Sequence, residues 1–141
     1  MDQEEWLGST VNYEGHPMLL RVRPGAGRSA ARPVLVLLAA ITHRLAQVRA
    51  DGLPEAGYND GLADLDDAII ASLDAGGAGI TVVVETVAGE RTYYAYVTAP
   101  IHAQVALESV CIRFPEHHLS LATRRDESWQ LYDEYKRLFP W

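Results

Sequence analysis

The stretch ITVVVETVAGERTYYAYVT, residues 80–98, decides how the rest of the chain is arranged. Two runs rich in Val, Thr and Tyr flank the turn residues Ala88 and Gly89. Because β-branched and aromatic residues favour strands and a Gly-containing turn favours a tight reversal, the stretch predicts a β-hairpin. Pairing across this turn starts with Val87 opposite Glu90, and the pairs that follow are Val84 with Tyr93, Val82 with Ala95, and Ile80 with Val97.

These pairs give the hairpin one apolar face. The opposite face is mixed, since it carries Thr81 with Tyr96, Val83 with Tyr94, and Glu85 with Thr92. Two alternatives are open for this mixed face, which can be exposed to solvent or covered by another element. A bulged turn would shift the register by one residue and exchange the faces of one strand.

Length and composition indicate one globular domain. The chain has 141 residues, of which 48% are hydrophobic and 22% charged, and it is too short for two comfortable domains. A single cysteine excludes an internal disulfide and fits a reducing compartment. The acidic start, MDQEEW, is unlike a secretory signal, and the longest apolar run, residues 34–41, is shorter than a membrane span. We therefore expect a cytoplasmic protein that does not enter a membrane.

The formal net charge of −7 is unevenly distributed along the chain. Residues 1–20 contribute −4, residues 21–50 contribute +6, residues 51–90 contribute −9, and the remainder cancels. Nucleic-acid-binding domains need a basic surface, so this balance argues against a nucleic-acid partner. Residues 51–90 contain neither Lys nor Arg, and such an acidic segment could attract a basic protein.

Before the central hairpin, the sequence predicts another hairpin and a buried strand. Residues 6–13 and 18–23 alternate in polarity around a Gly-Pro turn at 14–17. Residues 24–28 form a Gly-rich connector, which lacks the Gly-Lys-Ser/Thr ending of a phosphate-binding loop. Residues 34–42 are a continuous apolar run, typical of a central strand that is buried on both faces.

A helix is predicted between this strand and the central hairpin. Residues 49–59 form a loop, and Asn59 or Asp60 can cap a helix at 61–75. Gly76 and Gly77 end the helix. Its core stripe consists of Leu62, Leu65, Ile69 and Leu73.

After the central hairpin, we expect a helix at 100–114 that begins at Pro100. Alternation predicts a last strand at 118–123, and Asp126 is expected to cap a final helix. The apolar side of the first of these helices carries Ala103, Leu107, Val110, Cys111 and Phe114. The final helix carries Trp129, Leu131, Tyr132, Tyr135, Leu138 and Phe139.

From residue 34 onward the predicted order is strand, helix, strand, strand, helix, strand and an extra helix. This is the order of an α+β, ferredoxin-like split β-α-β sandwich (β-α-β-β-α-β), in which both helices cover one face of an antiparallel sheet. We expect one domain, with an N-terminal hairpin and connector (1–33), a ferredoxin-like core (34–124) and a C-terminal helix (125–141). The other sheet face would be open unless the first hairpin extends the sheet and the final aromatic helix folds over it.

Several short segments carry a family resemblance. Residues 126–132, DESWQLY, and the ending Leu138-Phe139-Pro140 resemble the end of the domain of unknown function (DUF) 695 family and of the related regulator of ribonuclease E activity B. Further segments resemble the first family, and these are Trp6 with Tyr13 and Pro17, residues 51–54 (DGLP), residues 65–67 (LDD), and residues 86–96 with Gly89, Arg91 and Tyr93. The similarity to the ribonuclease regulator is limited to the second half of the chain.

What the resemblance implies about function is limited. The first family has no assigned activity, whereas the regulator is a non-catalytic protein that binds and inhibits an endoribonuclease. The regulator has a ferredoxin-like α/β sandwich, which agrees with the fold predicted from the residues. Similarity of fold transfers function poorly, so a role in nuclease regulation is an analogy.

The thiol and the imidazoles show no catalytic or metal-binding pattern. Cys111 lies on the apolar side of the helix at 100–114 with no His at a fixed spacing, which favours core packing over nucleophilic chemistry. We therefore predict no catalytic residue, no metal and no cofactor. The histidines lack a zinc-binding spacing, and they are His16, His43, His102, His117 and His118.

Asp60, Asp64 and Asp67 stack along one side of the helix at 61–75, and Asp66 lies beside them. Three carboxylates with this spacing could chelate a divalent cation. The favoured interpretation is a solvated face near a helix N-terminus, where the helix dipole favours acids. The same acidic face could bind a basic protein.

Aromatic residues provide the remaining candidates. Tyr94 and Tyr96 on an exposed sheet face would resemble the base-stacking platform of RNA-binding modules, but the acidic charge weakens this interpretation. Trp129 and Tyr132, at helical spacing, are expected to anchor the last helix on the sheet rather than to form a recognition surface. The candidate binding residues are Asp60, Asp64, Asp67, Glu85, Tyr94, Tyr96, Trp129 and Tyr132.

The leading hypothesis is a non-catalytic, cytoplasmic bacterial protein that binds a protein partner, as an inhibitor or immunity-type regulator of a nuclease. The alternative is a small-molecule or nucleotide binder with a pocket formed by the sheet, the loop 49–59 and Tyr94 or Tyr96. A metal-dependent hydrolase that uses the helix carboxylates is the third hypothesis. The sequence does not specify an oligomeric state.

Overall fold

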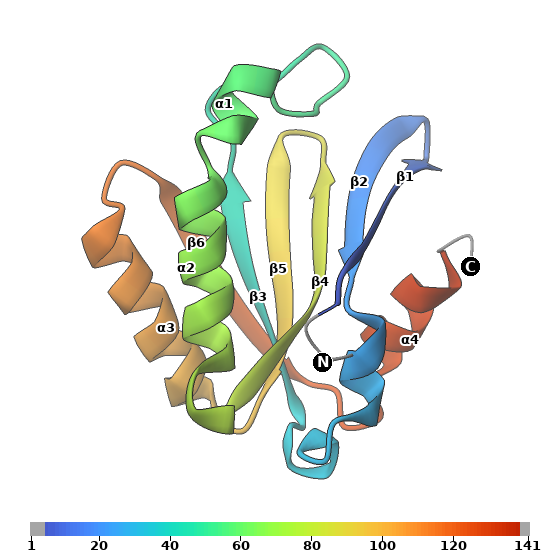
Figure 1. Ribbon diagram of the computed structural model, residues 1–141, viewed down its shortest axis with the longest axis vertical. Helices are drawn as coiled ribbons and strands as arrows, with labels where there is room; N and C mark the ends of the chain where they lie inside the picture. Colours follow the sequence, from blue (N-terminus) through green and yellow to red (C-terminus); the bar gives the residue numbers. More distant parts are fainter. Residues whose placement is uncertain (1–4, 139–141) are drawn as a thin grey trace.

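The central hairpin forms the middle of a six-stranded antiparallel sheet in the computed structural model, which describes residues 5–138. Its strands are β4 (Gly79–Val87) and β5 (Glu90–Val97). The strand order is β1-β2-β4-β5-β3-β6 (Figure 1). The remaining strands are β1 (Leu7–Tyr13), β2 (His16–Val22), β3 (Leu37–Arg44) and β6 (His118–Arg125).

The register of the central hairpin follows the prediction near the turn and departs from it further on. The first pairs are as expected, namely Val87 with Glu90, Val84 with Tyr93 and Val83 with Tyr94. Beyond an irregularity at Val82, the pairs become Thr81 with Ala95, Ile80 with Tyr96 and Gly79 with Val97. The predicted partners of Ile80, Thr81 and Val82 were therefore wrong, because an extra residue enters the strand within its length and not at the turn. As a result, the adjacent residues Val82 and Val83 both join one hydrophobic cluster.

Two helices, α2 (Ala63–Asp74) and α3 (Pro100–Arg113), cover one side of the sheet, which we call the helical face (Figure 1). The predicted spans 61–75 and 100–114 agree with these helices to within two residues. α2 packs along α3 and against β4 and β5. The cluster under the two helices consists of Ala39, Ile41, Leu45, Leu62, Leu65, Ala68, Ile69, Leu73, Val84, Tyr93, Ala95, Val97, Ala103, Ala106 and Val110. Cys111, expected in this core, is only half-buried.

The opposite side of the sheet, which we call the distal face, is partly covered by α4 (Gln130–Arg137) and the 3-10 helix η2 (Pro24–Arg28). The mixed face of the central hairpin is therefore covered around Val83 and Tyr96, which are both buried. The distal cluster consists of Met18, Leu20, Val22, Ala26, Leu35, Leu38, Ile80, Val82, Val83, Tyr96, Trp129 and Tyr132. Phe139 and Pro140, which the sequence placed at this end, lie outside the described residues.

Short helices replace segments that were predicted as loop or strand. α1 (Ala56–Asp60) occupies the end of the predicted loop 49–59, so Asn59 and Asp60 lie within it and do not cap α2, which starts after Leu62 without a side-chain cap. The 3-10 helix η3 (Arg32–Val34) precedes β3, so this strand begins at Leu37 and not at Val34, whose side chain is 60% exposed. The 3-10 helix η4 (Ala75–Gly77) follows α2, where the sequence predicted a Gly-Gly stop.

The fold is α+β, with six strands and four α-helices within residues 5–138. The sheet has more strands than the four of the predicted split β-α-β plan, because β2 pairs with β4 and β1 pairs with β2. The N-terminal hairpin therefore widens the sheet beyond the two helices, and this extension creates the cleft described below. In the part of the chain that the structure describes, no helix is long and apolar enough to cross a membrane.

Candidate functional site

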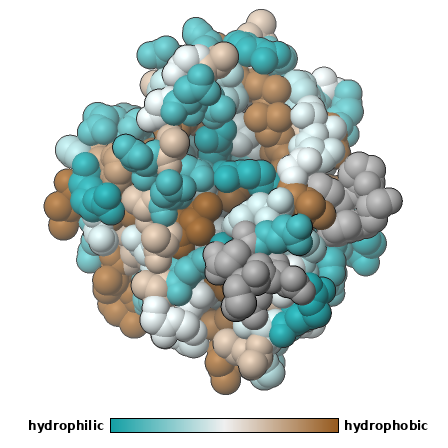
Figure 2. All heavy atoms as spheres, in the orientation of Figure 1, coloured by the Kyte–Doolittle hydropathy of each residue, from teal (hydrophilic) through white to brown (hydrophobic). Residues whose placement is uncertain are grey.

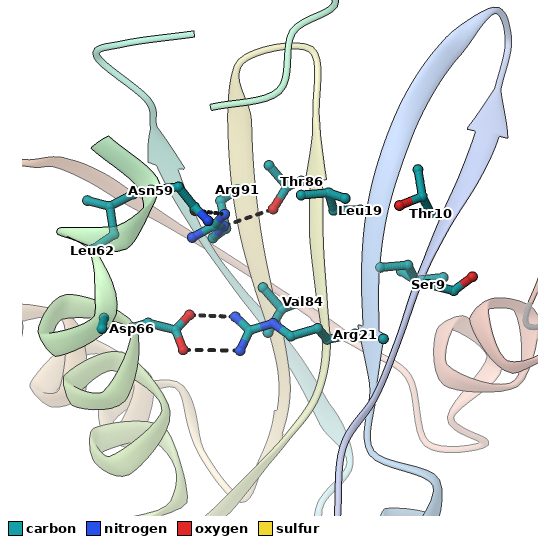
Figure 3. Close-up of a pocket in the computed structure, with 13 residues that line it drawn as sticks. Ser9, Thr10, Leu19, Arg21, Asn59, Leu62, Asp66, Val84, Thr86 and Arg91 are labelled. Carbon is teal, nitrogen blue, oxygen red and sulfur yellow. Dashed lines mark hydrogen bonds and ion pairs between the residues drawn. The ribbon is translucent and has the colours of Figure 1, made fainter. Parts of the chain in front are cut away.

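A cleft of about 510 Å³ lies on the helical face, between α2 and the hairpin of β1 and β2 (Figure 3). Its volume is in the range of small-molecule sites, which is about 300–1,000 Å³. Leu19, Leu62 and Val84 contribute apolar surface to the cleft. Its polar lining consists of Ser9, Thr10, Arg21, Asn59, Asp66, Thr86 and Arg91.

Three arginines of the sheet region meet three polar side chains of α1 and α2 across the helical face. The pairs are Arg23 with Asp74, Arg21 with Asp66, and Arg91 with Asn59. Asp66 and Asp74 are about two turns apart on α2, so both project toward the sheet. The first two arginines thus form ion pairs, whereas the third meets a neutral amide.

Asp66 is held by two partners on the floor of the cleft. The Arg21 guanidinium donates two hydrogen bonds to it, from Nη1 to Oδ2 at 3.1 Å and from Nη2 to Oδ1 at 2.5 Å. The Tyr93 hydroxyl donates to Oδ1 at 2.7 Å. Burial and the negative charge of Asp66 raise the pKa of Tyr93, so the hydroxyl stays protonated and remains a donor. Asp66 is therefore fixed as an acceptor and is not free to act as a base.

Arg91 lies at the other end of the cleft floor, between Asn59 and Thr86 (Figure 3). Its Nε donates to Thr86 Oγ1 at 2.8 Å and its Nη2 donates to Asn59 Oδ1 at 2.7 Å. The residue is only 7% exposed. Within residues 5–138, no carboxylate lies within ion-pair distance of this guanidinium. Because this positive charge is not paired, it makes this end of the cleft electropositive. Burying a cation without a counter-ion is also energetically costly.

His43 on β3 is the strand neighbour of Arg91 on β5, and both residues are buried. Burial, the neighbouring His117 and the charge of Arg91 lower the pKa of His43 to about 4. Both of its ring nitrogens are buried without a hydrogen-bond partner among the described residues, and its ring contacts that of His117 edge-on, with ring centroids 5.0 Å apart. The described residues contain no group of three His, Cys, Asp or Glu side chains that could hold a metal ion.

The predicted acidic residues are divided between the surface and the cleft. Asp60, Asp64 and Asp67 are exposed on α1 and α2. Asp66, which the sequence placed beside them, is the carboxylate that points into the cleft. The predicted pocket near the loop 49–59 matches the cleft only through Asn59, because the two tyrosines proposed for it, Tyr94 and Tyr96, lie on the distal face.

The aromatic candidates form the attachment of α4 to the distal face. Tyr96, Trp129 and Tyr132 are completely buried, so they serve packing and offer no surface to a ligand. The rings of Tyr96 and Trp129 stack at 4.2 Å, and the Trp129 Nε1 donates to the Leu35 carbonyl at 2.8 Å. Asp126 accepts hydrogen bonds from the Tyr96 hydroxyl and from the first backbone N–H groups of α4, which is the capping role predicted for it.

Glu85 and Tyr94 lie at the edge of this attachment. The Tyr135 hydroxyl donates to Glu85 Oε2 at 2.5 Å, and the Tyr94 hydroxyl donates to the same oxygen at 3.4 Å. The Tyr94 and Tyr135 rings are 5.6 Å apart. Glu85 and Tyr94, both predicted as binding residues, are half-buried. Both contact Tyr135 of α4.

Arg21, Asn59 and Arg91 are cleft residues that were not among the predicted candidates. A sequence signal existed for Arg91, because it shares the apolar period of β5 with Tyr93 and Ala95. A charged residue at such a position must find a polar partner or a ligand when it is buried. Asn59 gave no signal, since its role depends on the position of α1 above the sheet.

A second surface feature lies on the outer side of α3. Ile101, Val105 and Ile112 are 62%, 54% and 80% exposed, and their spacing places them along one side of the helix. Figure 2 shows hydrophobic residues along the margin over α3 and hydrophilic residues over α1 and the start of α2. The helical layer thus presents an apolar row next to exposed carboxylates.

Comparison with protein families gives one match. The model of a family of unknown function, DUF695, matches residues 4–136. The chain belongs to the DUF695 family. Comparisons with curated proteins and with solved structures give no match.

The DUF695 match spans both the cleft and the attachment of α4. Two of the segments that suggested the family, residues 65–67 and residues 89–93, meet at the cleft through Asp66, Arg91 and Tyr93. The segment 126–132 forms the α4 attachment instead. The segments that suggested the family therefore lie both in the attachment of α4 and on the polar floor of the cleft.

Proposed function

We propose that this DUF695 protein is a non-catalytic module that binds a protein partner through the outer surface of α1, α2 and α3. The observation that carries this proposal is the exposed row of Ile101, Val105 and Ile112. Exposed apolar side chains on one side of a helix, beside polar ones, are typical of protein interaction sites, and in this row the exposed Glu108 and Ser109 lie between Val105 and Ile112. An apolar row of this kind would lose water contact when a partner binds, which is the main source of binding free energy.

The charge next to this row favours a basic partner. Asp60, Asp64 and Asp67 are exposed on the same helical layer, and the segment 51–90 has no basic residue to neutralise them. Proteins that act on nucleic acids carry basic surfaces, so a nuclease has the required complementarity. A cytoplasmic, bacterial inhibitor or immunity-type regulator of a nuclease fits this chemistry.

Two further observations support a regulator over an enzyme. The proposed ferredoxin-like split β-α-β plan fits the element order from β3 to β6, and it is the fold of the regulator of ribonuclease E activity B, which the second half of the sequence resembles. Asp66, a carboxylate that faces the cleft, is engaged by Arg21 and Tyr93. Both oxygens of Asp66 thus already accept hydrogen bonds from protein donors.

The substitution Ile112→Lys tests the proposed surface. A lysine in this apolar row must be desolvated when a partner binds and repels a basic partner, so affinity should fall by about tenfold or more. Val34→Lys is the matched control, because Val34 is also exposed but lies in η3, away from the helical layer.

The experiment has two steps. The wild-type protein is used to capture proteins from its host, each captured nuclease is purified, and its inhibition and affinity are measured with wild type, Ile112→Lys and Val34→Lys. Inhibition that Ile112→Lys weakens and Val34→Lys preserves would support the proposal. Capture of no nuclease, or equal inhibition by both variants, would contradict it.

Small-molecule or nucleotide binding is a second candidate function. The observation that favours it is the cleft of about 510 Å³, whose floor holds a nearly buried arginine that has no carboxylate partner within residues 5–138. The two candidate functions use different surfaces, so one protein can have both.

A further inference from the structure

We propose that the cleft between α2 and the hairpin of β1 and β2 is a binding site for a small organic anion, and that Arg91 binds its carboxylate or phosphate group. This inference rests on the second candidate function and is independent of the α3 surface. The charge of the cleft, the hydrogen-bond donors of Arg91 and the apolar walls together restrict the chemical class of the ligand.

The charge balance of the cleft favours an anion. Of its two arginines, Arg21 is neutralised by Asp66 through two hydrogen bonds. Arg91 has only the neutral partners Thr86 and Asn59 within residues 5–138. One positive charge therefore remains at the end of the cleft near α1, and a ligand group with one negative charge would balance it.

The hydrogen-bond donors of Arg91 are correctly arranged for this role. A guanidinium has five N–H donors. One donor on Nε and one on Nη2 are used by the protein, and no described residue accepts from the other three. The two bonds to Thr86 and Asn59 fix the plane of the group, so the remaining edge is held in place before a ligand arrives. Carboxylate and phosphate oxygens accept two parallel hydrogen bonds from such an edge.

The walls indicate the rest of the ligand. Leu19, Leu62 and Val84 line the cleft next to the polar floor, and Ser9 and Thr10 line the side formed by β1. A ligand with an apolar body and one anionic group would bury both parts, as is common in small-molecule sites. A simple inorganic ion would use only the Arg91 end.

Asn59→Asp tests the role of Arg91 without disturbing its position. The amide nitrogen of Asn59 has no partner among the described residues, so its replacement by oxygen breaks no hydrogen bond and gives Arg91 an internal counter-ion. We expect this variant to lose anion affinity by about tenfold or more, because the ligand must then displace a carboxylate. Asn12→Asp is the matched control, since it makes the same change of charge at an exposed residue near the end of β1 that does not line the cleft.

The probes are benzoate, phenyl phosphate and neutral benzamide, titrated into the full chain and followed by the Nε–H resonance of Arg91 in NMR spectra. Saturable shifts with either anion, weaker in Asn59→Asp and unchanged in Asn12→Asp, would support the proposal. Binding of benzoate alone would identify a carboxylate ligand, and binding of phenyl phosphate alone a phosphate ligand. Absence of a shift with both anions, an equal shift with benzamide, or equal affinity of the two variants would overturn it.

These outcomes are separate from those of the protein-binding test. Asn59→Asp changes the cleft and leaves Ile101, Val105 and Ile112 untouched. Loss of nuclease inhibition in Ile112→Lys says nothing about the Arg91 resonance. Each proposal can therefore fail while the other stands.

Discussion

His43 is the side chain whose chemistry burial changes most clearly on the helical face. It is 1% exposed, and neither ring nitrogen has a hydrogen-bond partner in the part of the chain from residue 5 to 138. Burial, His117 and Arg91 lower its pKa to about 4, whereas an unperturbed histidine has a pKa of about 6.5. The folded protein therefore binds the proton on this ring less readily than the unfolded chain does.

This difference predicts a loss of stability in mild acid. Stability from the neutral ring is fully present above about pH 6.5 and decreases as the pH falls toward 4, because only the unfolded chain takes up the proton in this range. His43→Leu removes the titrating group at similar volume. Between about pH 7 and pH 5, we expect wild type to lose about 2 kcal/mol more unfolding free energy than the variant.

Urea unfolding at several pH values measures this difference. His16→Asn serves as the control, because it removes an imidazole that is exposed at the start of β2 and leaves His43 in place. Parallel pH profiles for wild type and His43→Leu would show that the ring does not remain neutral in the fold.

The junction between α2 and β4 depends on one glycine. A Cβ atom at Gly79 would lie 2.3 Å from the Leu73 carbonyl oxygen and 3.0 Å from Val97 Cγ1. The Leu73 carbonyl also faces His102 Nε2 at 2.7 Å, so neither helix can easily move away. Gly79 thus allows the end of α2 to approach the sheet.

Gly79→Ala should destabilise the protein by about 3 kcal/mol or more, because the backbone must shift to admit the methyl group. Gly57→Ala is the matched substitution, since its Cβ would meet nothing within 4 Å and alanine favours the helix α1. Thermal or urea unfolding compares the two variants. Similar stabilities would indicate that the end of α2 is not held against β4.

The sequence predicted the long elements because their residues are periodic. The stripe of Leu65, Ile69 and Leu73 indicated α2 to within two residues, and the β-branched runs indicated the central hairpin. α1 has only five residues, too few for a periodic pattern, and was predicted as loop. The bulge at Val82 was also unpredictable, since it lies in a run of similar apolar residues where a shift of one position leaves no trace in composition.

The cleft was less predictable than the elements that form it. Arg21 and Asp66 are 45 residues apart, and Arg91 and Asn59 are 32 apart, so the pairs depend on the addition of β1 and β2 to the sheet and on the position of α1. The sequence indicated the acidic helix but not which carboxylate turns inward. The exposed residues that it favoured, Asp60, Asp64 and Asp67, remain candidates for the protein surface only.

At the scale of the molecule, one sheet carries a hydrophobic cluster on each side. The distal cluster depends on the last part of the chain, because α4 packs against β4, and Trp129 and Tyr132 share the cluster with Met18 and Leu20 of β2. Tyr132 donates a hydrogen bond to the Arg23 carbonyl and Trp129 to that of Leu35, so the attachment of α4 connects residues about 100 positions apart. The sequence left open whether this sheet face is exposed or covered. In the structure, aromatic side chains within residues 126–132 cover part of it.

Trp129→Ala tests whether the attachment of α4 stabilises the whole fold. The side chain is fully buried against Tyr96 and Tyr132, and its removal would leave a cavity and an unpaired Leu35 carbonyl. We expect a loss of roughly 3–5 kcal/mol of unfolding free energy in urea. Ile112→Ala, which also truncates a large apolar side chain but at an 80% exposed position, should change stability by no more than about 0.5 kcal/mol. If Trp129→Ala changed only the near-ultraviolet circular dichroism of the aromatic side chains and left the unfolding midpoint unchanged, the sheet would be stable without the attachment of α4.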